Sequence, residues 1–307
     1  MRRRVWAWGV LGAMLVGGIA NGATTKEQAM RDAMTAPREG VDYVVVPAEG
    51  PIAGAEAWVR EHPDDAGAFY DLGRLHAMAW EPGGKAYLAR APKDGEMPAL
   101  PSFESPMNWK MKRALDPGAD KHMTASIAAL RRAVELKPDV ARHQMALAVM
   151  LMLVDDTPLE LPDVSGKQTG ESLQRFNAMA LKLGDPSAEV RTAADNALRA
   201  ALPGDADFLR TSKPANSEAA ARVTDILRSY CDMEAMAHFR RAFALAVDED
   251  LKVKDFGNNE AISYWAAGEI RDLLVKYPDK AEPGEVQKLT ELQDKLVKVP
   301  GVIKART

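Results

Sequence analysis

The stretch ASIAALRRAVELKPD, residues 125–139, decides the class of fold. Its apolar residues recur at steps of three and four, which is the spacing of one face of an α-helix. This face carries Ile127, Leu130 and Val134, together with Met123 two residues before the stretch. Pro138 predicts the end of the helix, because the residue before a proline is disfavoured in the helical region. Asp139 is suited to cap the following helix by accepting its free amide hydrogens.

The same pattern recurs along the chain. Residues 236–247 and 289–299 also carry apolar side chains at helical steps. Pro63 and Pro278 are each followed by an aspartate, so a helix end and a new cap are predicted at both places. One β-branched run, residues 43–46, is either a short strand or an extended lead-in. The sequence therefore predicts an all-α fold of amphipathic helices.

The order of large and small residues within these helices adds a second pattern. Leu130, Ala133 and Pro138 keep the spacing of a large residue, a small residue and a helix end. This arrangement resembles the second helix of a tetratricopeptide repeat. The segment before it resembles the first helix of such a repeat, with these residues in the family's Trp, Leu-Gly and Tyr positions: Phe69, Leu72, Gly73 and His76. Weaker matches to the repeat pattern occur at three places: Leu147-Ala148 with Leu151, Phe239–Ala242, and Ile270–Asp279, where Leu273 replaces the small alanine.

The resemblance implies an α-solenoid of antiparallel helix pairs, here with long irregular insertions, whose groove binds peptides or partner proteins. The residues that match the repeat pattern, such as Leu72, Gly73, Ala133 and Leu147, are expected to pack helices together. The inner face of the groove would be formed by Tyr70, Arg74, Ala77, Arg142, Met145 and Val149. The lysine and asparagine of the family's carboxylate clamp are missing from these positions, so an apolar or amphipathic segment is the expected occupant.

Residues 80–118 form an insertion rich in proline and glycine. It carries four aromatic residues that are candidates for partner binding: Trp80, Tyr87, Phe103 and Trp109. Aromatic side chains on a loop either form a recognition surface or fix the loop against the helices, and both roles are open here. Residues 155–170 and 203–216 are shorter irregular stretches.

The N-terminus predicts export. Three arginines, an uncharged run of about 16 residues and small residues at 20–23 follow the layout of a secretory signal peptide. Cleavage is expected after Gly22, giving a periplasmic or secreted product with no membrane segment. An uncleaved membrane anchor is the alternative.

These boundaries divide the chain into four parts. Residues 1–22 are the signal peptide and 23–50 an extended or helical lead-in. Residues 51–154 hold repeat-like helices with the insertion, and 155–307 a further repeat-like region with a C-terminal capping helix. The helices form one solenoid or two lobes split near 155–185.

Composition narrows the functional classes. The net charge of −4 disfavours a nucleic-acid partner, and the single cysteine, Cys231, excludes an intramolecular disulfide and is expected to be buried and inert. No two of the five histidines lie within five residues of one another, and neither a serine-nucleophile motif nor a cofactor motif is present. No catalytic, cofactor-binding or metal-binding residues are therefore predicted.

The preferred hypothesis is an exported, non-catalytic scaffold that binds a protein or peptide, without a prediction of its oligomeric state. The alternatives are an exported helical enzyme or accessory subunit with a site built from scattered residues, and an envelope-tethered structural protein.

Overall fold

A computed structural model of the chain describes residues 43–47, 49–80, 86–90, 119–153, 178–201, 216–256 and 261–301. The predicted signal peptide, the irregular stretch 155–170, and the aromatic residues Phe103 and Trp109 lie outside the described residues. In the described ranges, no helix is long and apolar enough to cross a membrane.

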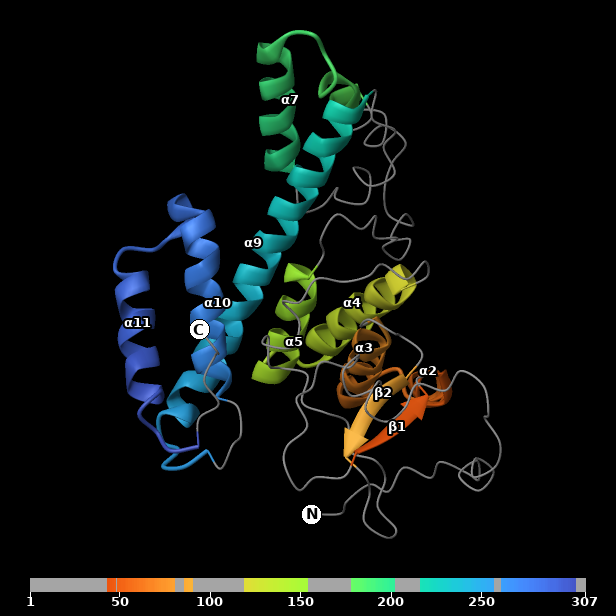
Figure 1. Cartoon of the computed structure of the whole chain (residues 1–307), viewed down its shortest axis with the longest axis vertical. Coiled ribbons are helices and arrows are strands. Elements are labelled where there is room, and N and C mark those ends of the chain that lie inside the picture. Colours follow the sequence, from red (N-terminus) through yellow and green to blue (C-terminus); the bar gives the residue numbers. More distant parts are fainter. Residues whose placement is uncertain are drawn as a thin grey trace.

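The described residues are helical apart from one two-stranded ribbon, which agrees with the predicted fold class at this level (Figure 1). The 3₁₀ turn η3 covers Pro278–Lys280. The helices are α2 (Glu49–Glu61), α3 (Ala66–Trp80), α4 (Ala119–Leu136), α5 (Ala141–Met152), α7 (Ala188–Ala201), α9 (Ser217–Asp250), α10 (Ile262–Lys276) and α11 (Glu285–Leu296).

The ribbon pairs β1 (Tyr43–Pro47) with β2 (Ala86–Arg90) in antiparallel register, with Tyr43 opposite Arg90. Residues 43–46 are therefore a strand, one of the two structures that the sequence left open. The prediction that 80–118 is irregular throughout is wrong at two places, because Trp80 is the last residue of α3 and 86–90 form β2. A ribbon between segments so far apart in the chain leaves no local periodicity to detect.

The predicted helix ends are confirmed at all three prolines, since α2, α4 and α10 end within two residues before Pro63, Pro138 and Pro278. The predicted caps are wrong. The carboxylate of Asp65, not that of Asp64, accepts hydrogen bonds from the first amides of α3. Val140 precedes α5 without a side-chain cap, and Gly284, at a φ of 74°, precedes α11.

The helices other than α7 pack in chain order: α2 on α3, α3 on α4, α4 on α5, α5 on α9, α9 on α10 and α10 on α11. Helix α7, which lies between α5 and α9 in the chain, packs against α9. The 34 residues of α9 span about 50 Å, longer than any other helix described. Its C-terminal half packs between α5 and α10, while its N-terminal half pairs with α7 and projects away from the other helices (Figure 1). The array is therefore extended rather than closed.

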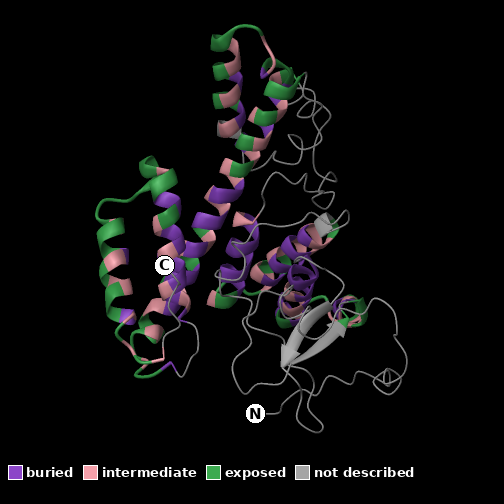
Figure 2. Cartoon of the chain, viewed as in Figure 1, coloured by how far each residue is buried: buried purple, intermediate pink, exposed green. Residues whose placement is uncertain are grey.

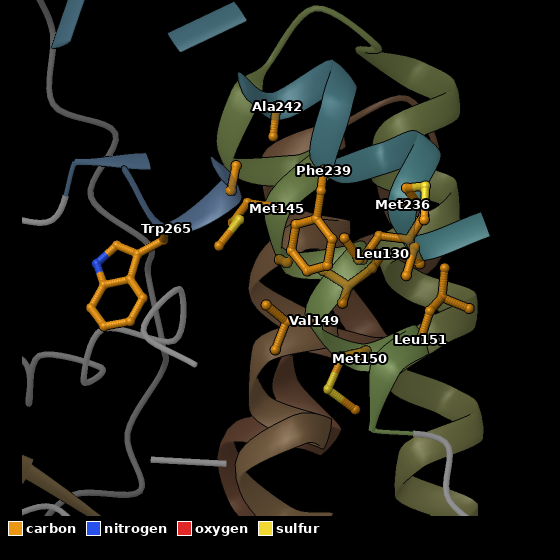
Figure 3. Packing of buried hydrophobic residues seen from close by; sticks show 14 of the residues in the cluster. Leu130, Met145, Val149, Met150, Leu151, Met236, Phe239, Ala242 and Trp265 are labelled. Atoms are coloured by element: carbon orange, nitrogen blue, oxygen red, sulfur yellow. The ribbon is translucent and has the colours of Figure 1, made fainter. Parts of the chain in front are cut away.

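The main core cluster joins α3, α4, α5, α9, α10 and α11. Phe239 of α9 is fully buried, and its ring points into the cluster among Leu130, Met145 and Val149 (Figure 3). Smaller clusters join α2 to α3 and α7 to the first half of α9. Buried residues are concentrated on α3, α4, α5, α9 and α10, whereas the outer faces of α7 and α11 are exposed (Figure 2).

Helices α3 and α4 approach each other closely at Gly73. A Cβ atom added at Gly73 would lie 2.6 Å from Cγ of Leu130, and the hydroxyl of Ser126 donates a hydrogen bond of 2.8 Å to the Gly73 carbonyl. Four residues predicted to pack helices are buried, as expected: Leu72, Gly73, Ala133 and Leu147. Cys231 is buried, as predicted.

Candidate functional site

The predicted groove face does not form an open surface in the described residues. Tyr70 and Ala77 of α3 and Met145 and Val149 of α5 are all buried and belong to the main core cluster. Their predicted exposure is wrong because both helices lie inside the array, α3 between α2 and α4, and α5 between α4 and α9. These side chains stabilise the fold, and a partner cannot reach them in this arrangement.

Charged residues at the edge of this region remain accessible. Arg142 of α5 is exposed, and the carboxylate of Asp71 on α3 is 44% exposed. Arg74 lies 3.6 Å from the Asp71 carboxylate, and its guanidinium is 5.4 Å from the ring centre of Tyr70. Burial raises the pKa of Asp71, although the positive charges of Arg74 and Arg142 act in the opposite direction. The Arg74 side chain is only 14% exposed, so the accessible charges are those of Asp71 and Arg142. We call Asp71, Arg142 and the mostly covered Arg74 the α3–α5 charged surface.

Two of the four aromatic candidates for partner binding, Trp80 and Tyr87, lie in the described residues. Trp80 is 5% exposed and packs in the core at the end of α3, which favours an anchoring role over recognition. Tyr87 lies on β2, where its backbone pairs with Val46. The ring of Tyr70 stacks on His143 of α5 at a centroid distance of 5.0 Å. Trp80 and Tyr70 therefore contribute to the packing between helices.

A polar network joins α4, α5 and α9. Arg131 donates to both carboxylate oxygens of Glu234, at 2.9 and 2.7 Å. On the same side of α9, Nδ1 of His238 lies 2.6 Å from the side-chain oxygen of Gln144, whose amide donates to the Pro138 carbonyl. Each of these contacts ties one helix to a neighbouring segment.

Electrostatics in this network favour fixed charges over proton transfer. Burial acts to raise the pKa of Glu234, but the hydrogen bond from His238 and the charge of Arg131 outweigh it, so the pKa is lowered. Burial and the negative charge of Glu234 raise the pKa of Tyr230 to about 12. Glu234 therefore stays ionised at neutral pH with both oxygens hydrogen-bonded, and it is poorly placed to act as a general base.

Comparison of the chain with protein-family models, with curated proteins and with solved structures finds no match.

Another buried acid has a similar structural role. Asp232 of α9 is 6% exposed and accepts hydrogen bonds from Lys276 at 2.5 Å and from the Tyr277 hydroxyl at 2.7 Å. These contacts fix the C-terminal end of α10 against α9. Asp250 at the end of α9 likewise accepts two hydrogen bonds from Ser263 of α10, from its amide and its hydroxyl.

The sequence analysis did not identify a pair of histidines that lie side by side on neighbouring helices. Nδ1 of His76 on α3 lies 3.0 Å from Nδ1 of His122 on α4, although 46 positions separate the two in the chain. Glu56 of α2 presents a carboxylate oxygen 3.8 Å from Nε2 of His76. The packing of α3 on α4 could have suggested this pair only if the register of the two helices were known. Within the described ranges, no group of three or more histidine, cysteine, aspartate or glutamate residues is arranged to hold a metal ion.

Proposed function

We propose that the protein is an exported, non-catalytic interaction scaffold that binds a protein or peptide partner on the outside of its helix array. The observation that carries this proposal is the packing of the helices other than α7 in chain order, which puts α2 and α11 at opposite ends of the array (Figure 1). An open array of this kind exposes a long surface relative to its core, and such surfaces commonly bind partner chains. Export rests on the signal-like pattern of residues 1–22.

The helix pair α3–α4 supports a tetratricopeptide-like arrangement within this proposal. Gly73, in the Leu-Gly position of the first helix, meets Leu130 of the second helix at the closest approach of the two backbones. Ala133, the small residue of the second helix, is fully buried. The insertion 80–118 connects these two helices without preventing their packing.

The described titratable residues support a binding role over catalysis. Glu234 and Asp232, two largely buried acids, hold helices together. Of the predicted groove residues Arg142 is exposed, and with Asp71, which the sequence did not single out, it gives the α3–α5 charged surface both signs of charge. We therefore place partner contact there and expect a polar segment with charges of both signs as the ligand, instead of the apolar segment that the sequence suggested.

The test begins with the chain from Ala23 onward as bait, cross-linked in an envelope fraction of the native host. A stoichiometric partner identified in this way is then purified and titrated against single variants. Arg142→Glu reverses a charge on the α3–α5 charged surface, and Arg241→Glu reverses an equally exposed arginine on α9 as the matched control.

We expect Arg142→Glu to weaken binding at least tenfold, with a steeper loss at low ionic strength, while Arg241→Glu leaves the affinity unchanged. Equal affinities for the two variants would exclude the α3–α5 charged surface. Failure to obtain any stoichiometric partner, together with turnover of a small molecule by the purified protein, would refute the scaffold function.

A further inference from the structure

The contact between His76 and His122 has room for one proton only. Nδ1 of His76 on α3 lies 3.0 Å from Nδ1 of His122 on α4, and the ring centres are 5.3 Å apart. At this distance one nitrogen donates a hydrogen bond and the other accepts it through its lone pair. A second proton between the rings would place two N–H groups opposite each other, so the rings would have to separate.

A neighbouring carboxylate indicates which ring donates. An oxygen of Glu56 on α2 lies 3.8 Å from Nε2 of His76, which favours a proton on that nitrogen. Nδ1 of neutral His76 is then the acceptor, and Nδ1 of His122 is the donor. A first added proton binds Nε2 of His122 and leaves the contact intact. A second added proton has to bind Nδ1 of His76, and this breaks the contact.

Nδ1 of His76 reaches water only if His122 moves away. His76 is 6% exposed, and the half-buried ring of His122 lies against its Nδ1. A buried imidazolium without a hydrogen-bond acceptor destabilises the fold. The second proton therefore favours a state in which His122 has left and water solvates the charge on His76.

The position of the pair in the fold shows which segment would move. The first turn of α4 holds both His122 and Lys121, and added positive charge destabilises the start of a helix because it opposes the macrodipole. The two helices are antiparallel here, since His76 meets His122 while Gly73, earlier on α3, meets Leu130, later on α4. The pair therefore joins the two helix ends that the insertion connects.

The groups around the pair disfavour its protonation in the closed fold. Burial, and then the charges of His122 and Lys121, lower the pKa of His76 to about 4. Burial and then Lys121 also lower the pKa of His122, while Glu56 acts in the opposite direction. Strand β2, which also contacts α3, carries Arg90 as its only charged residue.

Helix α5 contacts α3 at a different place, through the stacking of His143 on Tyr70, six residues before His76. Once separated, the rings of the pair regain the ordinary histidine pKa of 6.5 in water. The open state therefore binds more protons than the closed state, and a fall in pH from about 6.5 towards 4 favours opening.

We propose that His76 and His122 form an acid-sensitive latch, in which one shared proton holds the end of α3 on the start of α4 and protonation of both rings releases the first turns of α4. The first added proton charges His122 at the start of the helix, and the second removes the acceptor on His76. The latch goes beyond the proposed scaffold function and does not depend on it.

The size of the effect follows from the two pKa values of His76. A histidine with a pKa of about 4 when closed and 6.5 when open favours opening about 20-fold more at pH 5 than at pH 7. Hydrogen exchange followed by mass spectrometry of the purified exported protein measures opening at both pH values, after correction for the intrinsic pH dependence of exchange.

We expect protection of the amides at 77–80 and 123–127 to fall at least tenfold at pH 5. Helices α10 and α11 contain no histidine and serve as the internal control, with an expected loss below threefold. An equal loss in both regions would show global destabilisation and overturn the latch. An absence of loss at 77–80 and 123–127 would overturn it as well.

Substitution of the rings tests whether they cause the acid effect. Glutamine at both positions donates and accepts hydrogen bonds without titrating, so the His76→Gln/His122→Gln double variant is expected to lose less than threefold in protection between pH 7 and pH 5. An acid effect as large in the double variant as in the parent would overturn the proposal.

Two exposed charges keep the test decisive if the histidine variants fold poorly. Lys121 is exposed, and the Glu56 side chain is 46% exposed. Lys121→Gln is expected to make the ratio of opening at pH 5 to opening at pH 7 smaller, and Glu56→Gln to make it larger, because the two charges act on His122 in opposite directions. Effects of either variant that do not depend on pH cancel in this ratio. A change of the same sign in both variants would overturn the latch.

Discussion

Replacing Gly73 by alanine tests the close contact between α3 and α4. The new Cβ would lie 2.6 Å from Cγ and 2.8 Å from Cδ2 of Leu130, and 3.3 Å from the backbone oxygen of Ser126. Distances below 3.0 Å are too short for carbon atoms, so α3 and α4 must move apart or Leu130 must leave its rotamer. Leu130 is fully buried, and the space into which it could turn is filled by the main core cluster.

The expected change in stability combines three contributions. Overpacking of a core costs about 1–3 kcal/mol. Separation of the helices also weakens the hydrogen bond from Ser126 to the Gly73 carbonyl, which contributes about 1 kcal/mol. Alanine gains about 1 kcal/mol over glycine in helix propensity. Gly73→Ala is therefore expected to lower the free energy of unfolding by roughly 1–3 kcal/mol, which reverses the usual effect of this substitution in a helix.

Urea unfolding followed by circular dichroism measures this change, with Gly268→Ala as the matched control. A Cβ at Gly268 of α10 would lie 3.1 Å from the end of the flexible Gln293 side chain, so this variant is expected to stay within about 1 kcal/mol of the parent. Leu130→Ala is expected to cost less in the Gly73→Ala background by at least about 1 kcal/mol, because it removes the atoms that clash. Unchanged stability of Gly73→Ala, or additive effects in the double variant, would refute the close contact.

Three further predictions concern the core, the polar network and the N-terminus. Phe239→Ala is expected to lower the free energy of unfolding by about 3–5 kcal/mol, whereas Val275→Ala, at a side chain that is 84% exposed, changes it by less than about 0.5 kcal/mol in the same urea assay. Because the hydrogen bond with His238 and the charge of Arg131 lower the pKa of Glu234 in the fold, these contacts stabilise the protein above about pH 4.5, and this stabilisation is lost as the pH falls through the lower folded pKa. Glu234→Gln should therefore cost about 1–3 kcal/mol at pH 7 and make the stability measured by urea unfolding less dependent on pH between about 5 and 3. Intact-mass spectrometry of the exported protein is expected to show the loss of residues 1–22, and a retained N-terminus would favour the tethered alternative.

Features determined by neighbouring residues were predictable from the sequence. The spacing of Ile127, Leu130 and Val134 reports which side of one helix is apolar, and Pro138 ends that helix regardless of tertiary contacts. Capping is less certain because several polar residues compete near a helix start. Asp64 and Asp65 both precede α3, and only the geometry of the turn selects Asp65.

Features that depend on distant residues were not predictable in the same way. Tyr70 and Met145 occupy positions that a regular repeat would expose, yet α3 and α5 are covered on both sides by other helices. The number of neighbours of a helix is a property of the whole array, and it decides whether such a residue lines a groove or fills a core. The same limit applies to β2, whose partner strand begins at Tyr43.

The polar contacts between helices explain why scattered histidines and acids need not imply catalysis. A buried charge or amide destabilises the fold unless a partner satisfies it, so such groups occur in pairs at helix crossings. Glu234 with Arg131, and Asp232 with Lys276, fit this rule because each acid is held by a positive group from another helix. The histidine pair on α3 and α4 follows the same rule without a charge, because Nδ1 of His76 and Nδ1 of His122 lie 3.0 Å apart and each ring supplies the other with a hydrogen-bond partner. In the described helices, these scattered histidines and acids therefore join one helix to another.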